Sequence, residues 1–389
     1  MIYIHIPLCR SFCTYCGFYS EILPEQDCTS AGRLADRICA EARARAEEIR
    51  ESIDGQGCVD TLYIGGGTPS VLPPGVLSRI VRTVSTCGRD GGPFEEFTLE
   101  VNPDDIVRGG PEYVRSVRDL GVTRISMGVQ SFDDRILRWM NRRHDAASAV
   151  RAVEILREGG IPAISLDLIF GIPHLEDAVW EETLRRAVSL SPEHISAYQL
   201  SVEEGSTLAG QIASGRESEA PAAQCSRQYD RLCRVLGAAG YHHYEISNFA
   251  LPGHEAVHNS AYWRRVPYVG LGPGAHSFRV AEAGNPSAPV EVRSWNAETL
   301  GDYAAESEIL SAEDAFVEKV MLALRTDKGL SEKYLQEHCR ADVLAALRRE
   351  GGLVPAGNGE TLLRIPEERF FVCDDIIRRL ISAENESYL

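Results

Sequence analysis

The first half of the chain alternates short β-rich runs with longer helical patterns, and this alternation limits the fold more than any other feature. A strand followed by a helix is the unit that builds parallel sheets with right-handed crossovers. We expect strands at 3–6, 61–64, 97–101, 124–129, 163–168 and 194–198. We expect the helices between them at 29–51, 74–84, 111–120, 133–140, 146–158 and 176–189. The predicted class is α/β, and both an open doubly wound sheet and a partial (β/α)6 barrel fit this order.

The pattern changes after about residue 205. A helical pattern over 220–240 precedes a stretch rich in Gly, His and aromatic residues, and 280–300 is predicted to be a linker or surface loop. Three helical patterns, two short β-runs and a last helix at 371–382 then predict a small winged-helix-like α+β domain. We therefore predict three domains: a barrel, a barrel extension with a linker, and the C-terminal domain, covering 1–205, 206–300 and 301–389.

Charge and composition exclude several classes of protein. The chain has 57 acidic residues against 40 Lys and Arg, and its net charge is −17. Residues 311–389 contain 15 acidic and 11 basic residues, so even the winged-helix-like part lacks the basic face that nucleic-acid binding needs. No run of about 18 apolar residues is present, and the N-terminus does not resemble a signal peptide. We expect a cytoplasmic protein with no transmembrane segment and no nucleic-acid partner.

Three of the eleven cysteines lie close together, at Cys9, Cys13 and Cys16, just after the first predicted strand. In a reducing compartment, clustered cysteines indicate metal or redox chemistry more often than disulfides. Three thiolates are one short of a closed zinc site. They suit a four-iron cluster held at three irons, whose fourth iron is free to bind a small molecule. A zinc site completed by His5 or His258, and three unrelated thiols, are the alternatives.

The spacing Cys9-x3-Cys13-x2-Cys16, with Tyr15 inside it, resembles the signature of radical S-adenosylmethionine (SAM) enzymes. The preceding string Tyr-Ile-His-Ile-Pro at 3–7 is similar to that of oxygen-independent coproporphyrinogen III oxidase and its relatives. The resemblance extends to about residue 380. It implies a [4Fe-4S] cluster whose open iron chelates the amino and carboxylate groups of SAM, and one-electron cleavage of SAM to a 5′-deoxyadenosyl radical.

The same resemblance implies which residues contact SAM. Gly66, Gly67 and Thr68 follow the second predicted strand and are similar to the strip that receives the methionine end of SAM, although a lone glycine run is more often only a turn. Tyr15 belongs to the cysteine motif, and Gln130 ends the fourth predicted strand. The other contacts that the resemblance implies are Tyr3, Glu100, Arg142, Asp167 and Ser201.

One argument for this site does not depend on the family. The cysteines and several polar residues fall at or near the C-terminal ends of successive predicted strands, where parallel α/β proteins build their sites. Five or six strands that contribute to one site favour a curved sheet over a flat one. Asp167 lies in an apolar run, so its carboxylate must be paired or hydrogen-bonded. Besides the cysteines, the residues of this argument are Gly66, Glu100, Gln130, Asp167 and Tyr198.

Two departures from the oxidase pattern point to its haem chaperone relatives. Phe18 stands where the oxidase has a fourth cysteine, and the chain begins only eight residues before Cys9, where the oxidase has a long extension. The run from His258 to Trp263 resembles the HNxxYW motif of the haem chaperones. A neutral imidazole is a good axial ligand of haem iron, and aromatic rings can pack on a porphyrin. The candidate haem contacts are His258, Asn259, Tyr262 and Trp263.

Without the family, His258 would be interpreted as a loop histidine satisfied by hydrogen bonds. With it, we expect a chaperone that carries the cluster and SAM, binds haem and transfers it to haem-accepting proteins such as membrane respiratory proteins. A monomer and a homodimer are both compatible with the sequence. The alternatives are radical decarboxylation of coproporphyrinogen III and another radical SAM reaction.

Overall fold

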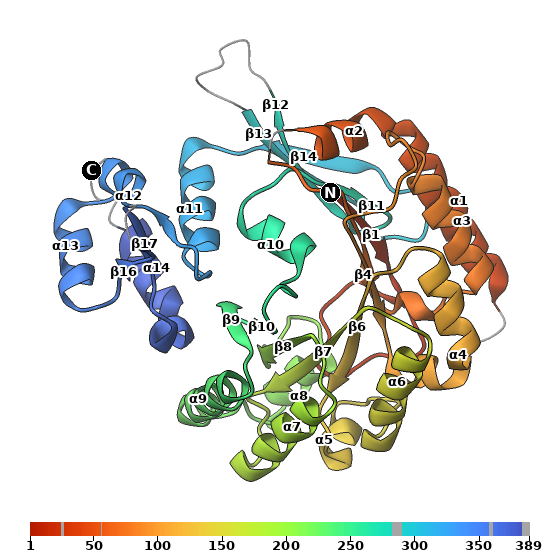
Figure 1. Ribbon diagram of the computed structural model, residues 1–389, viewed down its shortest axis with the longest axis horizontal. Coiled ribbons are helices and arrows are strands. Elements are labelled where there is room, and N and C mark those ends of the chain that lie inside the picture. The colour runs from red at the N-terminus through yellow and green to blue at the C-terminus, as the bar shows by residue number, and fades with distance from the viewer. Residues whose placement is uncertain (25–26, 56, 282–289, 358–360, 383–389) are drawn as a thin grey trace.

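A curved sheet with helices on its outer side forms the body of the protein (Figure 1). The computed structural model describes residues 1–24, 27–55, 57–281, 290–357 and 361–382. Six neighbouring strands of the sheet are parallel and follow chain order. The predicted partial (β/α)6 barrel is confirmed. The six strands are β1 (Ile2–Ile6), β4 (Thr61–Gly66), β5 (Glu96–Val101), β6 (Arg124–Gln130), β7 (Ala163–Phe170) and β8 (His194–Gln199).

The outer helices lie close to where the sequence predicts them, with two differences. The expected helix at 29–51 is two helices, because the chain bends at Arg45. The expected helix at 111–120 begins earlier, at Pro103. It is kinked at Gly110, which has a φ of 63°, and the next residue, Pro111, cannot donate a helical hydrogen bond. The helices are α1 (Cys28–Ala44), α2 (Ala46–Asp54), α3 (Pro74–Val84), α4 (Pro103–Asp119), α5 (Asp134–Trp139), α6 (Ala146–Glu158) and α7 (Asp177–Ser189).

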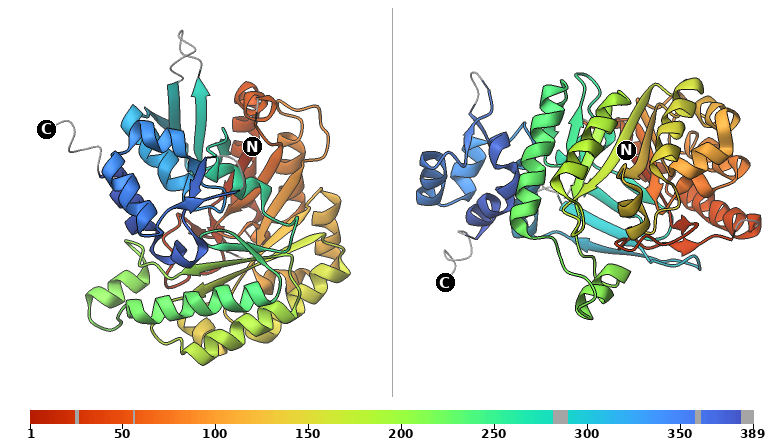
Figure 2. Two further views of the ribbon diagram at one scale, coloured as in Figure 1. Left: turned by 60° about the vertical axis from the view of Figure 1, so that its left-hand side comes forward. Right: turned by 90° about the horizontal axis from the view of Figure 1, so that it is seen from below.

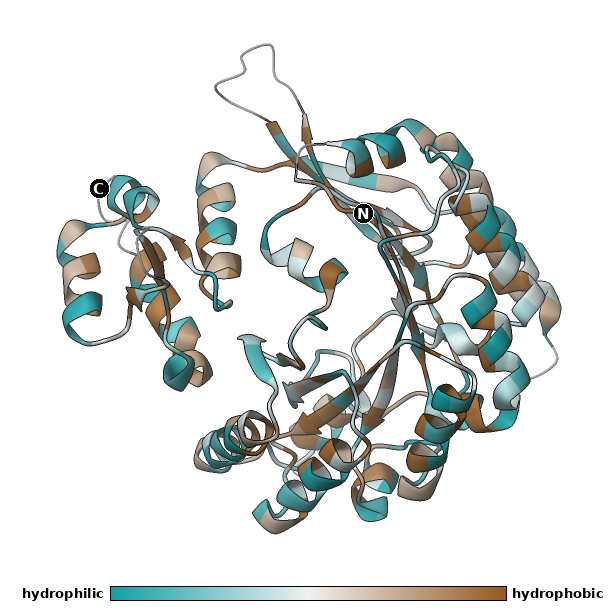
Figure 3. Ribbon diagram, in the orientation of Figure 1, coloured by the Kyte–Doolittle hydropathy of each residue, from teal (hydrophilic) through white to brown (hydrophobic). Residues whose placement is uncertain are grey.

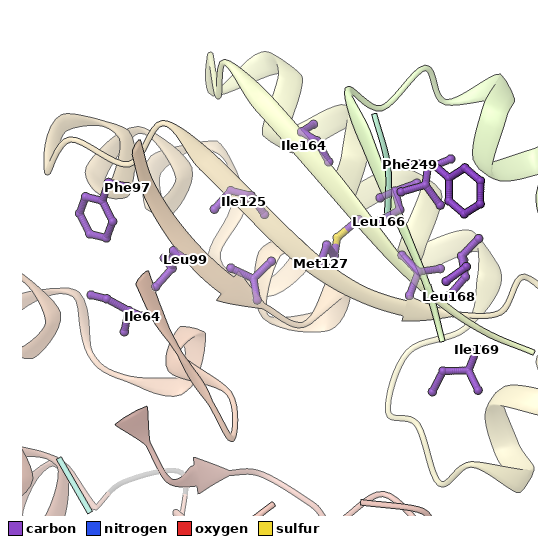
Figure 4. Packing of buried hydrophobic residues seen from close by; sticks show 14 of the residues in the cluster. Ile64, Phe97, Leu99, Ile125, Met127, Ile164, Leu166, Leu168, Ile169 and Phe249 are labelled. Atoms are coloured by element: carbon purple, nitrogen blue, oxygen red, sulfur yellow. The ribbon is translucent and has the colours of Figure 1, made fainter. Parts of the chain in front are cut away.

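The two faces of the parallel strands differ in chemistry. Successive side chains of a strand point to opposite faces. Apolar residues recur along the strands and the helices that cover them, coloured brown in Figure 3. One set, apolar and fully buried, packs between the sheet and the helices (Figure 4) and includes Phe97, Leu99, Ile125, Met127, Ile164 and Leu166. The alternate positions are largely polar and face the inside of the barrel: Thr98, Glu100, Ser126, Ser165, Asp167 and Ser196. The fold therefore places its apolar core outside the sheet and leaves a polar interior.

Strands from beyond residue 205 complete the main sheet. β11 (Val269–Leu271) pairs in parallel with β1, whereas β10 (Asn248–Ala250) pairs antiparallel with β8 and with β9 (His242–Glu245). The predicted boundary at residue 205 therefore does not coincide with the end of the sheet. The helices of this region are α8 (Thr207–Ala213), α9 (Ala222–Ala238) and α10 (Val257–Trp263), the last of which lies inside the curve of the sheet (Figure 1).

The predicted linker at 280–300 is wrong for most of its described residues. β12 (His276–Ala281), β13 (Val290–Asn296) and β14 (Ala305–Ile309) form an antiparallel three-stranded sheet. Residues 282–289 lie outside the described part of the chain. Alternation of Val290, Val292 and Ser294 with charged or aromatic residues is the strand signal that the prolines and glycine nearby obscured. Two short strands near the cysteines, β2 (Leu8–Cys9) and β3 (Glu21–Ile22), pair with each other.

The C-terminal region contains the predicted helices together with a small sheet. β15 (Leu330–Ser331), β17 (Leu362–Arg364) and β16 (Val354–Pro355) form that sheet in this order. The result matches the predicted α+β arrangement. The helices are α11 (Ala312–Ala323), α12 (Glu332–His338), α13 (Ala341–Arg349), the 3-10 helix η2 (Glu367–Val372) and α14 (Cys373–Ile381). In the described ranges, no helix combines the length and apolar character needed to cross a membrane.

Candidate functional site

A cavity of about 590 Å³ fills the inside of the barrel and reaches the loops at the C-terminal ends of the strands. The alternate, inward-facing positions of β5, β6, β7 and β8 supply its walls. The cysteine loop lies at its rim, and residues of α10 and the N-terminal ends of strands lie at its floor. The register of the strands brings these wall residues side by side. Glu100 of β5 lies opposite Ser126 of β6, and Asp167 of β7 lies between Gly128 of β6 and Ser196 of β8.

The three cysteines of the motif all line this cavity. Each is partly buried and free of disulfides. Cys9 Sγ lies 3.5 Å from Thr68 Oγ1, and the Arg142 guanidinium donates a hydrogen bond to Cys13 Sγ over 3.3 Å. Burial raises the pKa of the Cys9 and Cys16 thiols. A bound metal that deprotonates the thiols would offset that cost.

The glycine strip after β4 leaves no room for side chains. A Cβ on Gly66 would lie 2.6 Å from the His5 ring, and the φ of this residue is 110°. A Cβ on Gly67 would lie 2.8 Å from the Leu8 carbonyl oxygen. Only glycine fits this close approach to the cysteine loop. The strip therefore presents backbone groups to the cavity, as its resemblance to the SAM methionine strip implies.

Two carboxylic acids face the interior from neighbouring parts of the sheet. Glu100 accepts hydrogen bonds from the Tyr63 hydroxyl at 2.7 Å and the Gly66 N–H at 3.0 Å, and Asp167 accepts one from Ser126 Oγ at 3.0 Å. Burial raises the pKa of Glu100 to about 7 and that of Asp167 to about 6, although these hydrogen bonds act in the opposite direction. Both acids thus titrate close to neutral pH, as at many functional sites.

Arg142 connects the acid wall to the cysteine loop. Besides Cys13, its guanidinium donates to the side-chain oxygen of Asn102 and to the Gly128 carbonyl. Its Nε is buried and has no hydrogen-bond partner among the described residues. A buried donor without a partner is costly unless a ligand or water satisfies it. The Arg142 guanidinium therefore places a positive charge with an uncompensated donor at the wall of the cavity, beside the cysteines.

Gln130 is held in an unusual conformation at the end of β6. Its φ is 68°, and the pairing of β6 with β7 shifts by one residue between Gly128 and Gln130. This bulge interrupts the alternation of side chains and aims Gln130 into the cavity. Strained backbone of this kind is common where a side chain must meet a ligand.

Most predicted site residues meet in this cavity, but four do not. Its lining includes the three cysteines and, in addition, Tyr15, Gly66, Gly67, Thr68, Glu100, Gln130, Arg142, Asp167, Ser201 and Asn259. Tyr3 lies behind the wall and packs on Tyr63, with ring centroids 6.0 Å apart. His258, Tyr262 and Trp263 are also not part of the lining. Sequence reasoning did not select the wall residues Tyr63, Thr98, Asn102, Ser126 and Ser196, although their alternation with apolar residues could have found those within the strands.

His258 lies at the opposite end of the strands from the cysteines. Its Nδ1 lies 2.8 Å from Thr61 Oγ1, its Nε2 lies 3.1 Å from the Tyr262 hydroxyl, and the side chain is fully buried. Burial lowers its pKa to about 3, so the ring is neutral at pH 7. Thr61 begins β4 and Gly66 ends it, a separation of about 16 Å at strand spacing. In this conformation both ring nitrogens are engaged, which is the arrangement of a hydrogen-bonded structural histidine.

The raised pKa values of the buried acids predict how stability depends on pH. A carboxyl group whose pKa is raised on folding stabilises the fold below its unfolded pKa, and that contribution is lost as the pH rises through the folded value. We therefore expect the contribution of Glu100 and Asp167 to the free energy of unfolding of the cluster-free protein to fall between about pH 4 and pH 7, whereas the lowered pKa of buried His258 acts in the opposite direction. The stability of the natural chain relative to Glu100→Gln should therefore fall across this range. Urea titrations of both proteins across this range measure the difference, and parallel curves would contradict the assignment for Glu100.

Comparisons with known proteins agree with this geometry. The family model of the radical SAM superfamily matches residues 3–187. The heme chaperone HemW of Bacillus subtilis (strain 168) is 32% identical to this chain, and the match covers 86% of this chain and 86% of that protein. The heme chaperone HemW of Synechocystis sp. is also 32% identical, and the match covers 90% of this chain and 84% of that protein. The structure titled coproporphyrinogen III oxidase (HemN) from Escherichia coli has a TM-score of 0.75 at 20% identity, covering 97% of this chain and 89% of that one, which shows a shared fold. The chain therefore belongs to the HemW family of radical SAM proteins.

Proposed function

We propose that this chain is a haem chaperone that carries a [4Fe-4S] cluster and SAM in its barrel, binds haem, and transfers it to haem-accepting proteins in the cytoplasm or at the membrane. The observation that carries the proposal is the meeting of three thiols, a glycine strip and two acids in one cavity of a HemW family member. Membrane respiratory proteins are the acceptors we expect.

The cavity fits the cluster and SAM. Cys9, Cys13 and Cys16 would hold three irons, and their shared position on the rim of one cavity is what this requires. When bound, the cluster and SAM together supply one-electron chemistry at the SAM sulfonium. Arg142 places a positive charge 3.3 Å from Cys13 Sγ, where it would offset part of the negative charge of a cluster held by thiolates.

Residues of the walls suit the groups that SAM carries. The backbone of Gly66 and Gly67 can approach the methionine end, and the Arg142 guanidinium, which lines the cavity, would place a positive charge near a carboxylate. Glu100 and Asp167 can accept hydrogen bonds from ribose hydroxyls or offset the positive charge of SAM. Tyr3 would act indirectly, through Tyr63, on which it packs and whose hydroxyl binds Glu100, and through His5, whose Nδ1 lies 2.9 Å from the Tyr3 hydroxyl.

Haem is proposed to bind on the α10 side of the barrel, at the HNxxYW segment. Tyr262 and Trp263 are only half-buried and could pack against a porphyrin, with Asn259 facing the cavity next to them. His258 can reach iron through Nε2 only if that atom gives up its hydrogen bond to Tyr262. Ligation by His258 therefore requires the Tyr262 hydroxyl to move, and this makes the assignment testable.

Haem titration of anaerobically purified protein, followed by the Soret band, tests the proposal. We expect stable haem uptake that is at least about tenfold weaker in His258→Ala. Tyr262→Phe, which keeps the ring but frees Nε2, should bind haem as well as the natural chain or better. Unchanged uptake in His258→Ala, together with a lowered melting temperature, would mean that His258 only supports the fold.

A second experiment tests whether the protein is instead a coproporphyrinogen III oxidase. The same protein is incubated anaerobically with SAM, dithionite and coproporphyrinogen III, and the expected result is no protoporphyrinogen IX. Phe18, which is 71% exposed on the rim, leaves the cysteine loop without a fourth thiol at this position. Formation of protoporphyrinogen IX would refute the chaperone proposal in favour of the oxidase.

A further inference from the structure

Three potential metal ligands meet where the C-terminal region contacts the edge of the main sheet, far along the chain from the cysteine motif. Cys233 lies on α9, His243 on the edge strand β9, and Glu367 at the start of η2. One ligand atom from each lies within 4.8 Å of the other two. Figure 2 shows the C-terminal region (blue) beside the long helix α9 (green). The three residues therefore join two parts of the molecule.

The distances suit a small tetrahedral ion. Cys233 Sγ lies 3.9 Å from His243 Nδ1, and Nδ1 lies 3.1 Å from Glu367 Oε1. In a tetrahedral zinc site with bonds of about 2.0 to 2.3 Å, neighbouring ligand atoms lie about 3.3 to 3.6 Å apart. These two distances fall on either side of this range, and the third pair, Cys233 Sγ and a Glu367 carboxylate oxygen, lies within 4.8 Å, so side-chain shifts of up to about one ångström would bring the ligands to it. Such shifts are within reach of a side-chain rotation.

The surroundings of His243 hold its ring in place. It stacks on Phe249, with ring centroids 4.0 Å apart and an interplanar angle of 13°, and Phe370 meets it edge-on. On its far side, Nε2 lies 3.4 Å from both the Ile246 carbonyl and the Tyr229 hydroxyl. A proton on Nε2 that points to a carbonyl leaves the Nδ1 lone pair facing the thiol and the carboxylate. Metal-binding histidines are commonly oriented in this way.

We propose that Cys233, His243 and Glu367 bind a zinc-class divalent ion, with water as the fourth ligand. A thiolate, an imidazole and a carboxylate are ligands that zinc accepts, and the two negative charges balance the ion. The ion would fix the C-terminal region to the barrel edge. The backbone already connects them at another point, where Ile246 N–H donates to the Arg325 carbonyl at 3.0 Å and Asp327 N–H to that of Tyr244 at 3.0 Å.

Zinc content at a buffered free zinc concentration tests the site in the full, cluster-loaded chain. In the cluster-loaded chain the cysteine motif holds iron, so elemental analysis distinguishes iron at that motif from zinc at the proposed site. We expect one zinc per chain in the natural protein and a loss of about tenfold or more in zinc affinity in Cys233→Ser and in Glu367→Gln, with iron unchanged. Glu367 is half exposed, so its substitution should leave the fold intact. Cys225→Ser, on the same helix, is the matched control and should keep its zinc.

Hydrogen exchange gives a second readout that does not depend on metal analysis. Zinc should slow amide exchange in η2 and β9 of the natural chain and leave Cys233→Ser unchanged. Absence of zinc at micromolar free metal, or equal zinc in Cys233→Ser and the natural chain, would overturn the proposal. Neither result would affect the haem proposal, since the two sites share no residue.

Discussion

Cys9→Ser, Cys13→Ser and Cys16→Ser are each expected to abolish the iron–sulfur cluster. Each change removes one of the three thiolates that meet at the rim of the cavity, and a hydroxyl does not replace a thiolate as a ligand of iron in such clusters. Iron and sulfide per chain should fall from about four to background, together with the visible absorption of the cluster. Reconstitution under anaerobic conditions, followed by elemental analysis, measures this.

Cys225→Ser is the matched control for these variants. Cys225 is buried on α9 and is not part of the cavity lining. Its substitution removes a thiol of the same chain without removing a proposed ligand, so iron content should stay at the natural level. If Cys225→Ser lost as much iron as Cys13→Ser, or if Cys13→Ser kept its iron, the ligand assignment would be wrong.

Asp167→Ala is expected to weaken SAM binding by about tenfold or more, which corresponds to at least about 1.4 kcal/mol of binding free energy. The Asp167 carboxylate is fixed toward the cavity by Ser126, and its negative charge favours a cationic ligand. Because burial raises its pKa to about 6, SAM affinity of the natural chain should also decline as the pH falls below that value. Equilibrium dialysis with the reconstituted protein measures both effects.

Two further variants make this result specific. Asp167→Asn keeps the shape of the side chain and a contact with Ser126 but removes the charge, so its SAM affinity should be lower than that of the natural chain and should depend less on pH near 6, where Glu100 still titrates. Glu154→Ala removes an exposed carboxylate on α6 and should leave affinity unchanged. Natural affinity in Asp167→Ala would exclude Asp167 from the SAM site.

Much of the fold could be predicted because the barrel is built from local patterns. Runs such as 97–101 and 163–168 are apolar at every second position, and each is followed by a helical pattern. The strands β9, β10 and β11 were missed because they have only three or four residues, whereas β12 and β13 were missed because they flank a segment rich in glycine and proline. Pairing with a distant partner stabilises strands this short, and a single sequence does not reveal that partner.

The candidate site was predicted in part for the same reason. Residues at strand ends, such as Glu100 and Asp167, converge because parallel strands bring their C-terminal ends together. Arg142 reaches the site from the segment after α5, which only its resemblance to the family suggested. Cys233, His243 and Glu367 gave no signal at all, because they are ten and 124 residues apart and share no motif.

The sequence alone determined the order of the six strands, the position of three thiols in one loop and the family resemblance. Each of these can be recognised from residues that lie close together in the chain. Tertiary structure decided which side chains share a cavity and which are closed off. His258 is the clearest case, because its motif suggests a haem ligand whereas folding buries its ring between Thr61 and Tyr262 at the end of the barrel away from the cysteines. The physical reason is that burial and hydrogen bonding depend on partners 197 residues away, as for Thr61, which local patterns cannot specify.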